Sequence, residues 1–341
     1  MRITEGLGVY WRSLDSAQVG LDERTGVILD GLSRRELTLL AHLTRSLTEV
    51  ELTDRAKDLG VSKSRALRIV SMLERAGVME DVESGVPSPD SGPAWRIRHE
   101  KLDRRTGAKV FIPHLDQLGA GIAMGLADAG IGTIVTTDFS RVGVADHPAL
   151  RSEFLGTPRV PALTTSIRRR EPRVRILSER EDFASRPERA NLVDDVDLAI
   201  LTGSHLPDPL AGPALAARGV RVLHAWVEEV DLYVGPLTIP HESACAACLF
   251  QARLDADPAW DRLAQQALLA RPVEPETTSR ELAVALAVRE IVDVVDGAAP
   301  SLSGALWRIP PTPGLPEQLQ VEPHERCGCT MDRSAQLTAV N

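Results

Sequence analysis

The residues best suited to chemistry in this sequence are its 4 cysteines, all of which lie after residue 240. Cys245 and Cys248 form a CxxC pair, and Cys327 and Cys329 form a tighter CxC pair. Two close thiol pairs that are far apart in sequence can supply the four thiolates of a tetrahedral zinc site. Because such a site leaves no position for water, we expect a structural zinc ion that attaches the C-terminal tail to the domain.

Other interpretations of these cysteines stay open. They can be unpaired buried thiols, or the CxxC pair can be a redox motif, although a redox pair normally lies beside the first strand of its fold. His241 and His324 flank the two pairs and are alternative ligands. Histidines in loops are, however, commonly only solvated.

A second candidate site lies in segment 110–119, between an expected strand and an expected helix. A dinucleotide-binding turn needs the pattern GxGxxG there, so that the backbone can approach phosphate at the helix N-terminus. The two leading glycine positions hold His114 and Asp116, and only Gly119, whose role is helix–strand packing, is kept. Asp138 follows the second strand, where a ribose-binding acid belongs, although it also suits a cap or loop. Since Asp116 puts a carboxylate in the place of phosphate, the pattern argues against a working nucleotide site.

Composition limits the function classes. The chain has 341 residues, of which 43% are hydrophobic and 26% charged, as in an ordinary soluble globular protein. Its net charge of −9 argues against general nucleic-acid binding. No apolar run approaches the ~18 residues of a membrane span, and the first residues have no apolar signal core. We therefore expect a cytoplasmic protein that does not contact a membrane.

The elements expected over residues 1–82 form a first domain. Two short strands, 18–21 and 27–29, precede three helices at 33–46, 48–59 and 62–76, with Ser62 placed to cap the third helix and Gly77 to end it. Two helices joined by a tight turn and followed by a strand indicate a winged helix. Residues 83–104 are expected to be a linker, because 83–93 is rich in Gly, Pro and Ser, although a long wing is also consistent.

Residues 105–330 show a different pattern of secondary structure. Strands expected at 109–112, 133–137, 174–177, 197–201 and 220–223 alternate with helices at 118–129 and 158–170, and a late amphipathic helix covers 279–296. This alternation predicts an α/β domain in which helices cover both faces of a parallel, Rossmann-like sheet. Residues 331–341 are expected to be a tail.

The second domain resembles the ThiF/MoeB family of ubiquitin-activating-like adenylyltransferases, through LGAGIAMGLADAGIGTIVTTDFSRV at 118–142 and the paired cysteines. More closely, the chain resembles the ThiF-like proteins that accompany YcaO enzymes, which make azoline rings in ribosomal peptides. PHESACAACLFQAR at 240–253 and EPHERCGC at 322–329 carry this likeness, and AQVGLDERTGVILDGLS at 17–33 is similar to their peptide-recognition element. The resemblance implies a zinc site, a bound leader peptide and a homodimer.

The family's adenylating residues do not carry over. The second acid of the strand motif is Ser140, the catalytic lysine position holds Arg159, and the magnesium-binding aspartate falls on Ser204. Arg151 lies only near the expected arginine. Arginine does not simply replace lysine at a phosphate, and Mg²⁺ loses a hard oxygen ligand. The resemblance therefore implies a degenerate nucleotide site of Gly119, Asp138 and Arg159, with no catalytic residue and no bound ATP.

The function expected is that of a leader-peptide-binding scaffold partner of a YcaO-type cyclodehydratase, without independent catalysis. The peptide would add as a strand in the groove between a strand and the third helix. One alternative is an active ATP-dependent adenylyltransferase. Another is a DNA-binding regulator that uses the basic residues of helix 62–76, which are Lys63, Arg65, Arg68 and Arg75. The equal numbers of acidic and basic residues over 1–105 argue against DNA.

Overall fold

The computed structural model describes residues 1–4, 6–80, 90, 103–178 and 195–330. The chain divides into two compact units, Met1–Leu102 and Asp103–Asn341. No described helix is both long and apolar enough to cross a bilayer. The tail expected at 331–341, and all of the 83–104 linker except Asp90 and the start of the next helix, lie outside the described residues.

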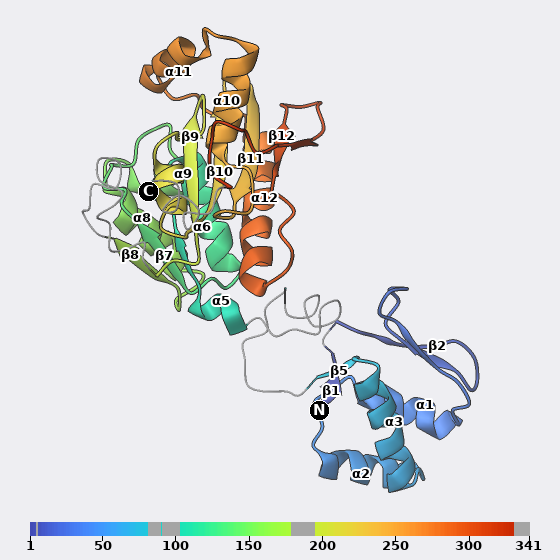
Figure 1. Ribbon diagram of the computed structural model, residues 1–341. Helices are drawn as coiled ribbons and strands as arrows, with labels where there is room; N and C mark the ends of the chain where they lie inside the picture. Colours follow the sequence, from blue (N-terminus) through green and yellow to red (C-terminus); the bar gives the residue numbers. More distant parts are fainter. Residues whose placement is uncertain (5, 81–89, 91–102, 179–194, 331–341) are drawn as a thin grey trace, which may run out of the picture. The chain divides into compact units, whose positions relative to one another are not determined.

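The first unit combines three helices with short strands (Figure 1). Its elements are β1 (Arg2–Ile3), β2 (Val9–Trp11), β3 (Ala17–Val19), β4 (Val27–Leu29), α1 (Arg34–His42), α2 (Glu49–Asp58), α3 (Lys63–Arg75) and β5 (Met79–Glu80). Strands β2, β3 and β4 form an antiparallel sheet in that order, and β1 pairs with β5. Leucines from all three helices are packed in one core with Ala17 and Val19 of β3.

Side-chain caps explain where these helices begin. Ser33 and Thr48 make capping boxes with the glutamates three residues later, and the Ser62 hydroxyl accepts a hydrogen bond from the Arg65 N–H. The second and third predicted helices are confirmed, whereas the first ends at His42 and not at Ser46. The residues that would form a wing, 83–93, are not described apart from Asp90, so the winged-helix assignment stays a prediction.

The second unit is built on an eight-stranded sheet with the order β13-β12-β11-β10-β9-β6-β7-β8. The strands are β6 (Lys109–Phe111), β7 (Thr133–Thr136), β8 (Arg175–Ser178), β9 (Leu198–Ser204), β10 (Arg221–Glu228), β11 (Asp231–Thr238), β12 (Ala305–Ile309) and β13 (Glu317–Gln320). All five predicted strands are present and mutually parallel. The expectation of a parallel sheet is incomplete, because β11, β12 and β13 extend it in antiparallel fashion.

Helices cover both faces of this sheet, as predicted. They are α5 (Asp103–Gly107), α6 (Gln117–Asp128), α7 (Pro148–Phe154), α8 (Arg159–Arg168), α9 (Ala211–Ala216), α10 (Ala246–Ala256), α11 (Trp260–Leu269) and α12 (Thr277–Asp296). The larger core lies under α6, α8 and α12, and a smaller one lies between α9 and the opposite face. Figure 1 shows α6 and α12 side by side on the sheet. A buried ion pair of 2.7 Å between Arg105 and Asp296 joins α5 to the end of α12.

Candidate functional site

The order of the parallel strands identifies the point of the sheet at which a nucleotide would be expected to bind. Numbered along the chain, the five strands run 3-2-1-4-5, so the strand order reverses between β6 and β9. Open α/β sheets bind ligands in the crevice outside the carboxyl ends of the strands at such a switch point. The turn from β6 into α6 lies there, which makes residues 112–119 the candidate site.

Asp116 occupies this crevice. Its side chain caps α6 by accepting a hydrogen bond of 2.8 Å from the Gly119 N–H. Its other carboxylate oxygen accepts a hydrogen bond of 2.9 Å from the Thr202 hydroxyl on β9. The Asp116–Thr202 bond thus spans the switch point, and the helix N-terminus that would receive phosphate is already occupied by a carboxylate.

Gly119 keeps the turn tight. A Cβ atom built at this position would lie 2.0 Å from the His114 carbonyl oxygen and 3.3 Å from Cγ2 of Ile112. Any other residue would therefore require the turn to move away from the helix. The side chain of His114, at the first missing glycine position, is exposed to solvent.

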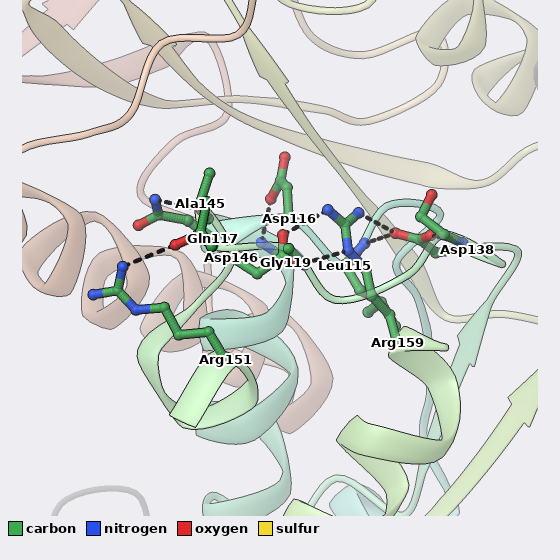
Figure 2. A network of polar contacts seen from close by, with 12 residues as sticks. Leu115, Asp116, Gln117, Gly119, Asp138, Ala145, Asp146, Arg151 and Arg159 are labelled. Atoms are coloured by element: carbon green, nitrogen blue, oxygen red, sulfur yellow. Dashed lines mark hydrogen bonds and ion pairs between the residues drawn. The ribbon is translucent and has the colours of Figure 1, made fainter. Parts of the chain in front are cut away.

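Arg159 is bound between two aspartates (Figure 2). Its guanidinium donates to Asp138 at 2.9 Å, and to the two carboxylate oxygens of Asp146 at 2.5 and 3.0 Å. Both aspartate side chains are nearly inaccessible to solvent, at 2% for Asp138 and 6% for Asp146. We call these three residues the Arg159 triad. The structure thus brings together the two predicted site residues Asp138 and Arg159, with their charges already engaged.

Backbone groups complete the coordination of the triad. Asp138 also accepts hydrogen bonds from the N–H groups of Leu115 and Ser140, at 2.7 and 2.8 Å. Burial raises the pKa of Asp138, but these hydrogen bonds and the charge of Arg159 outweigh it, and the net pKa is below the usual value. The pKa of Asp116 is instead above the usual value, because burial outweighs the hydrogen bonds from Gly119 and Thr202 that lower it. Asp138 is therefore favoured as a carboxylate, whereas ionised Asp116 is disfavoured.

The remaining expected positions have structural partners. The Ser204 hydroxyl accepts a hydrogen bond of 2.8 Å from the Val273 N–H, and Arg151 donates to the Val144 carbonyl at 3.0 Å. No role was expected for Asp146 from the sequence. Its distance of 13 residues from Arg159, across a turn and α7, gave no local signal for the pairing.

The four cysteines come together at the start of α10. Their sulfur atoms all lie within 4.8 Å of one another, and the individual separations are 3.9 Å for Cys245–Cys248 and 3.4 Å for both Cys245–Cys327 and Cys248–Cys329. Four thiolates at ~2.3 Å from a tetrahedral zinc ion would be about 3.8 Å apart. The thiols are free, with both residues of the CxxC pair buried. The donor set and its spacing fit a metal ion.

Groups next to this cluster contact its sulfur atoms but do not belong to the set of possible metal ligands. The His324 backbone N–H donates to Sγ of Cys248 at 3.3 Å, whereas the His324 ring is 2.7 Å from a carboxylate oxygen of Asp255. Hydrogen bonding from Cys245 lowers the pKa of Cys248. Among the described residues, the group able to hold a metal contains the four cysteines and neither His241 nor His324.

Solved structures resemble this chain, whereas comparisons of its sequence find no relative. No protein-family model matches the chain, and no curated protein matches it in sequence. Solved structures do match. Escherichia coli MccB with ATP has a TM-score of 0.63 at 12% identity, over 96% of this chain and 99% of MccB. MccB with the peptide MccA gives 0.65 at 11% identity, and selenomethionine PaaA gives 0.66 at 16% over 93% of this chain and 99% of PaaA.

The chain has a ThiF-like fold. The likeness extends over nearly its full length, and identities of this size show the fold alone. MccB is described as a microcin C7 biosynthetic enzyme and was solved in complex with N-formylated MccA. The particular subclass of ThiF-like proteins that accompany YcaO enzymes remains an expectation from the sequence.

Proposed function

We propose that this chain is a peptide-binding ThiF-like scaffold that presents a leader peptide to a YcaO-type cyclodehydratase and does not itself adenylate. The observation that supports this most directly is the Arg159 triad with the Asp116–Thr202 bond across the switch point. An adenylating site needs unpaired cations for phosphates and an open helix N-terminus. Here the cation is neutralised by two carboxylates and the helix N-terminus is capped.

The first unit offers an edge for the peptide. Strand β4 pairs with β3 on one side and with no other described strand, so its second edge can accept an added strand. Ile28 of β4 is in register with Gln18 and Tyr10, and the side chains of Ile28 and Tyr10 are 48% and 42% exposed. A peptide strand along the free edge of β4 would place a side chain beside Ile28.

The partner claim is tested by co-purification. The tagged full chain, isolated from its own cells, is expected to retain a precursor peptide and a YcaO protein that mass spectrometry identifies. Ile28→Lys should reduce peptide recovery at least ten-fold, because a charged side chain on an edge strand opposes pairing. Val50→Lys on α2 is the control, since Val50 is 70% exposed and far from β4 in sequence. Recovery of neither a peptide nor a YcaO protein with the wild-type chain contradicts the proposal.

An active adenylyltransferase is the second candidate, favoured by the full-length likeness to MccB, which was solved with ATP. ATP–pyrophosphate exchange in the presence of Mg²⁺ distinguishes the two functions. We expect no exchange above background with or without a co-purified peptide. Exchange that depends on the peptide would show that the Arg159 triad opens, and would replace the scaffold proposal by adenylation. A DNA-binding role is disfavoured, because Arg65 of α3 is paired with Glu36 at 2.5 Å.

We also propose that the metal is zinc and that the four cysteines hold it. All-thiolate tetrahedral sets are typical of structural zinc. The ion would anchor residues 327–329 to α10 and would have no part in chemistry. A homodimer is proposed from the family resemblance and is tested by light scattering.

A further inference from the structure

A dense run of arginines lies where α8 ends and β8 begins. Five arginines occur within the eight residues 168–175, in a chain whose net charge is −9. They are Arg168, Arg169, Arg170, Arg173 and Arg175, and all of them are exposed. Cations are favoured at a helix C-terminus, which accounts for the first three, at the end of α8. Arg173 and Arg175 lie beyond this helix, so the helix dipole does not explain them.

Three of these arginines have no acidic partner among the described residues. The two ion pairs that the run does make are Arg169–Glu153 at 2.7 Å and Arg170–Asp128 at 3.2 Å. Arg175 donates at 3.2 Å to the hydroxyl of Thr133, which is neutral. Arg168 and Arg173 make no ion pair within the part of the chain that the structure describes. The run therefore keeps positive charge that an acidic group from outside can neutralise.

The strand that follows the arginines has an open edge. Strand β8 is the last of its sheet and pairs with β7 alone among the described strands (Figure 1). The Arg175 N–H donates to the Gly132 carbonyl at 2.9 Å, so Arg175 and Leu177 direct their backbone groups towards β7. The backbone N–H and C=O groups of Ile176 and Ser178 consequently point away from β7, where they can pair with one more strand. The side chain of Leu177 is 39% exposed.

The charge restricts which strand can be added. We call β8 together with Arg168 and Arg173 the arginine edge. A second copy of this chain is disfavoured there, because two copies would bring their arginine runs together, and like charges on paired strands are destabilising. An acidic strand would instead place carboxylates near the arginines, with which guanidinium groups make strong hydrogen bonds. Nucleic acid would use the arginines but not the free backbone groups of an edge strand.

We propose that the arginine edge binds an acidic, extended segment of another protein, which is added to the sheet beside β8. Its backbone would pair with Ile176 and Ser178, and its carboxylates would neutralise the unpaired arginines. An apolar residue between the carboxylates would contact Leu177. Assignment of this segment to a YcaO-type partner rests on the proposed function. The preference for an acidic strand rests on the arginine edge alone, which lets the two be tested apart.

The test uses the blocked peptide acetyl-Glu-Val-Glu-Val-Glu-Val-amide, titrated into the full chain by isothermal calorimetry. The comparison peptide has lysine in place of every glutamate, and a short DNA duplex is the nucleic-acid comparison. We expect saturable binding of the acidic peptide that weakens with added salt, and at least ten-fold weaker binding of the lysine peptide. Absence of saturable binding, equal binding of both peptides, or binding of the duplex in preference to the acidic peptide overturns the proposal.

A charge reversal localises the binding. Arg173→Glu should weaken the acidic peptide at least ten-fold, because it replaces an unpaired cation of the arginine edge by an anion. Arg262→Glu on α11 is the matched control, since Arg262 is also exposed, makes no ion pair among the described residues and gives the same change in net charge. It should leave the affinity within two-fold. Equal effects of the two variants would place the binding elsewhere and contradict the proposal.

A proline separates strand addition from attraction of charge. Ser178→Pro removes an N–H that points away from β7, so the melting temperature should stay unchanged while the acidic peptide binds several-fold more weakly. Unchanged affinity in this variant would show that the surface binds by charge alone, and strand addition would be wrong. Peptide binding without a co-purified YcaO protein would support the arginine edge and contradict the scaffold function. A co-purified YcaO protein without peptide binding would do the reverse.

Discussion

The Arg159 triad and the four-cysteine cluster are both sets of polar side chains, but they differ in what completes them. In the triad, Arg159 satisfies Asp138 and Asp146, and backbone N–H groups satisfy the remaining carboxylate oxygens. In the cluster, four sulfur atoms lie within 4.8 Å of one another, and a thiol is a weak hydrogen-bonding group. The first set is complete without a ligand, whereas the second could hold a metal ion.

This difference shows that a residue of a suitable type is not always free to bind a ligand. Asp138 and Arg159 are types that a nucleotide site uses, and they lie near the switch point where such a site belongs. Their geometry nevertheless leaves no free charge for phosphate. The cysteines are ordinary as single residues, but their four sulfur atoms together form a set that could hold a metal ion. Availability of the functional atoms therefore decides which region binds a ligand.

The largest effect should follow removal of one thiol. Cys327→Ser is expected to release zinc and to lower the melting temperature by roughly 10 °C or more, because a structural metal contributes its binding energy to folding. Zinc content by atomic emission and thermal unfolding measure both consequences. A variant with full zinc and an unchanged melting temperature would contradict the four-thiolate site.

A control removes the nearest alternative ligand. His324→Gln should keep stoichiometric zinc, because the His324 ring contacts Asp255 and not the metal cluster. Its effect on stability should be small, since the Asp255 side chain is 55% exposed. Loss of zinc in this variant would mean that the ring enters the ligand set.

The next largest loss of stability is expected from a change in the Arg159 triad. Arg159→Met should lower the free energy of unfolding by about 3 kcal/mol, because it leaves two buried carboxylates without their cation. Arg169→Ala is the matched control, since its ion pair with Glu153 is more than half exposed and should contribute less than about 0.5 kcal/mol. Urea unfolding at pH 7 measures both variants. Equal losses would show that the triad is no more than a surface ion pair.

The pH dependence sharpens this prediction. The folded-state pKa of Asp138 is lowered, so ionised Asp138 contributes stability above its unfolded pKa of about 3.9, and this contribution is lost as the pH falls through the folded value. The difference between wild type and Arg159→Met should accordingly shrink below about pH 4, where protonated carboxyls no longer require the arginine. A difference that stays constant with pH would exclude an electrostatic origin.

The sequence predicted local features well and long-range partners poorly. Ser62 and Gly77 mark the limits of α3 because caps are local signals, and the buried parallel strands are continuous apolar runs. Strand β11 was missed, because Gly235 and Pro236 interrupt its alternation and its pairing with β10 shifts register. Asp146 was missed as the partner of Arg159, because the pairing depends on how α7 and α8 pack. The cysteine pairs could be predicted because their spacing itself carries the chemistry.

The smallest effect on stability is expected from a change at Asp116, which occupies the switch point. Burial raises the folded-state pKa of Asp116, so folding favours its protonated form, and the associated stability is present below the unfolded pKa of about 3.9 and lost as the pH rises through the folded value. Asp116→Asn keeps an acceptor for the Gly119 N–H and carries no charge. This variant should therefore equal or exceed wild-type stability at pH 7, by up to about 1 kcal/mol, with the difference vanishing near pH 4.

Thr202→Val is the companion to that variant, because it removes the other hydrogen bond to Asp116 without changing charge. It should cost about 1 kcal/mol at pH 7 in the wild-type background and less when combined with Asp116→Asn, where no carboxylate needs the donor. Chemical unfolding of the four proteins in this double-mutant cycle gives the coupling. If Asp116→Asn is instead strongly destabilising at pH 7, the fold requires a carboxylate charge in the crevice. Asp116 would then be, like the four thiols, a group whose charge is available for a ligand, unlike the carboxylates of the Arg159 triad.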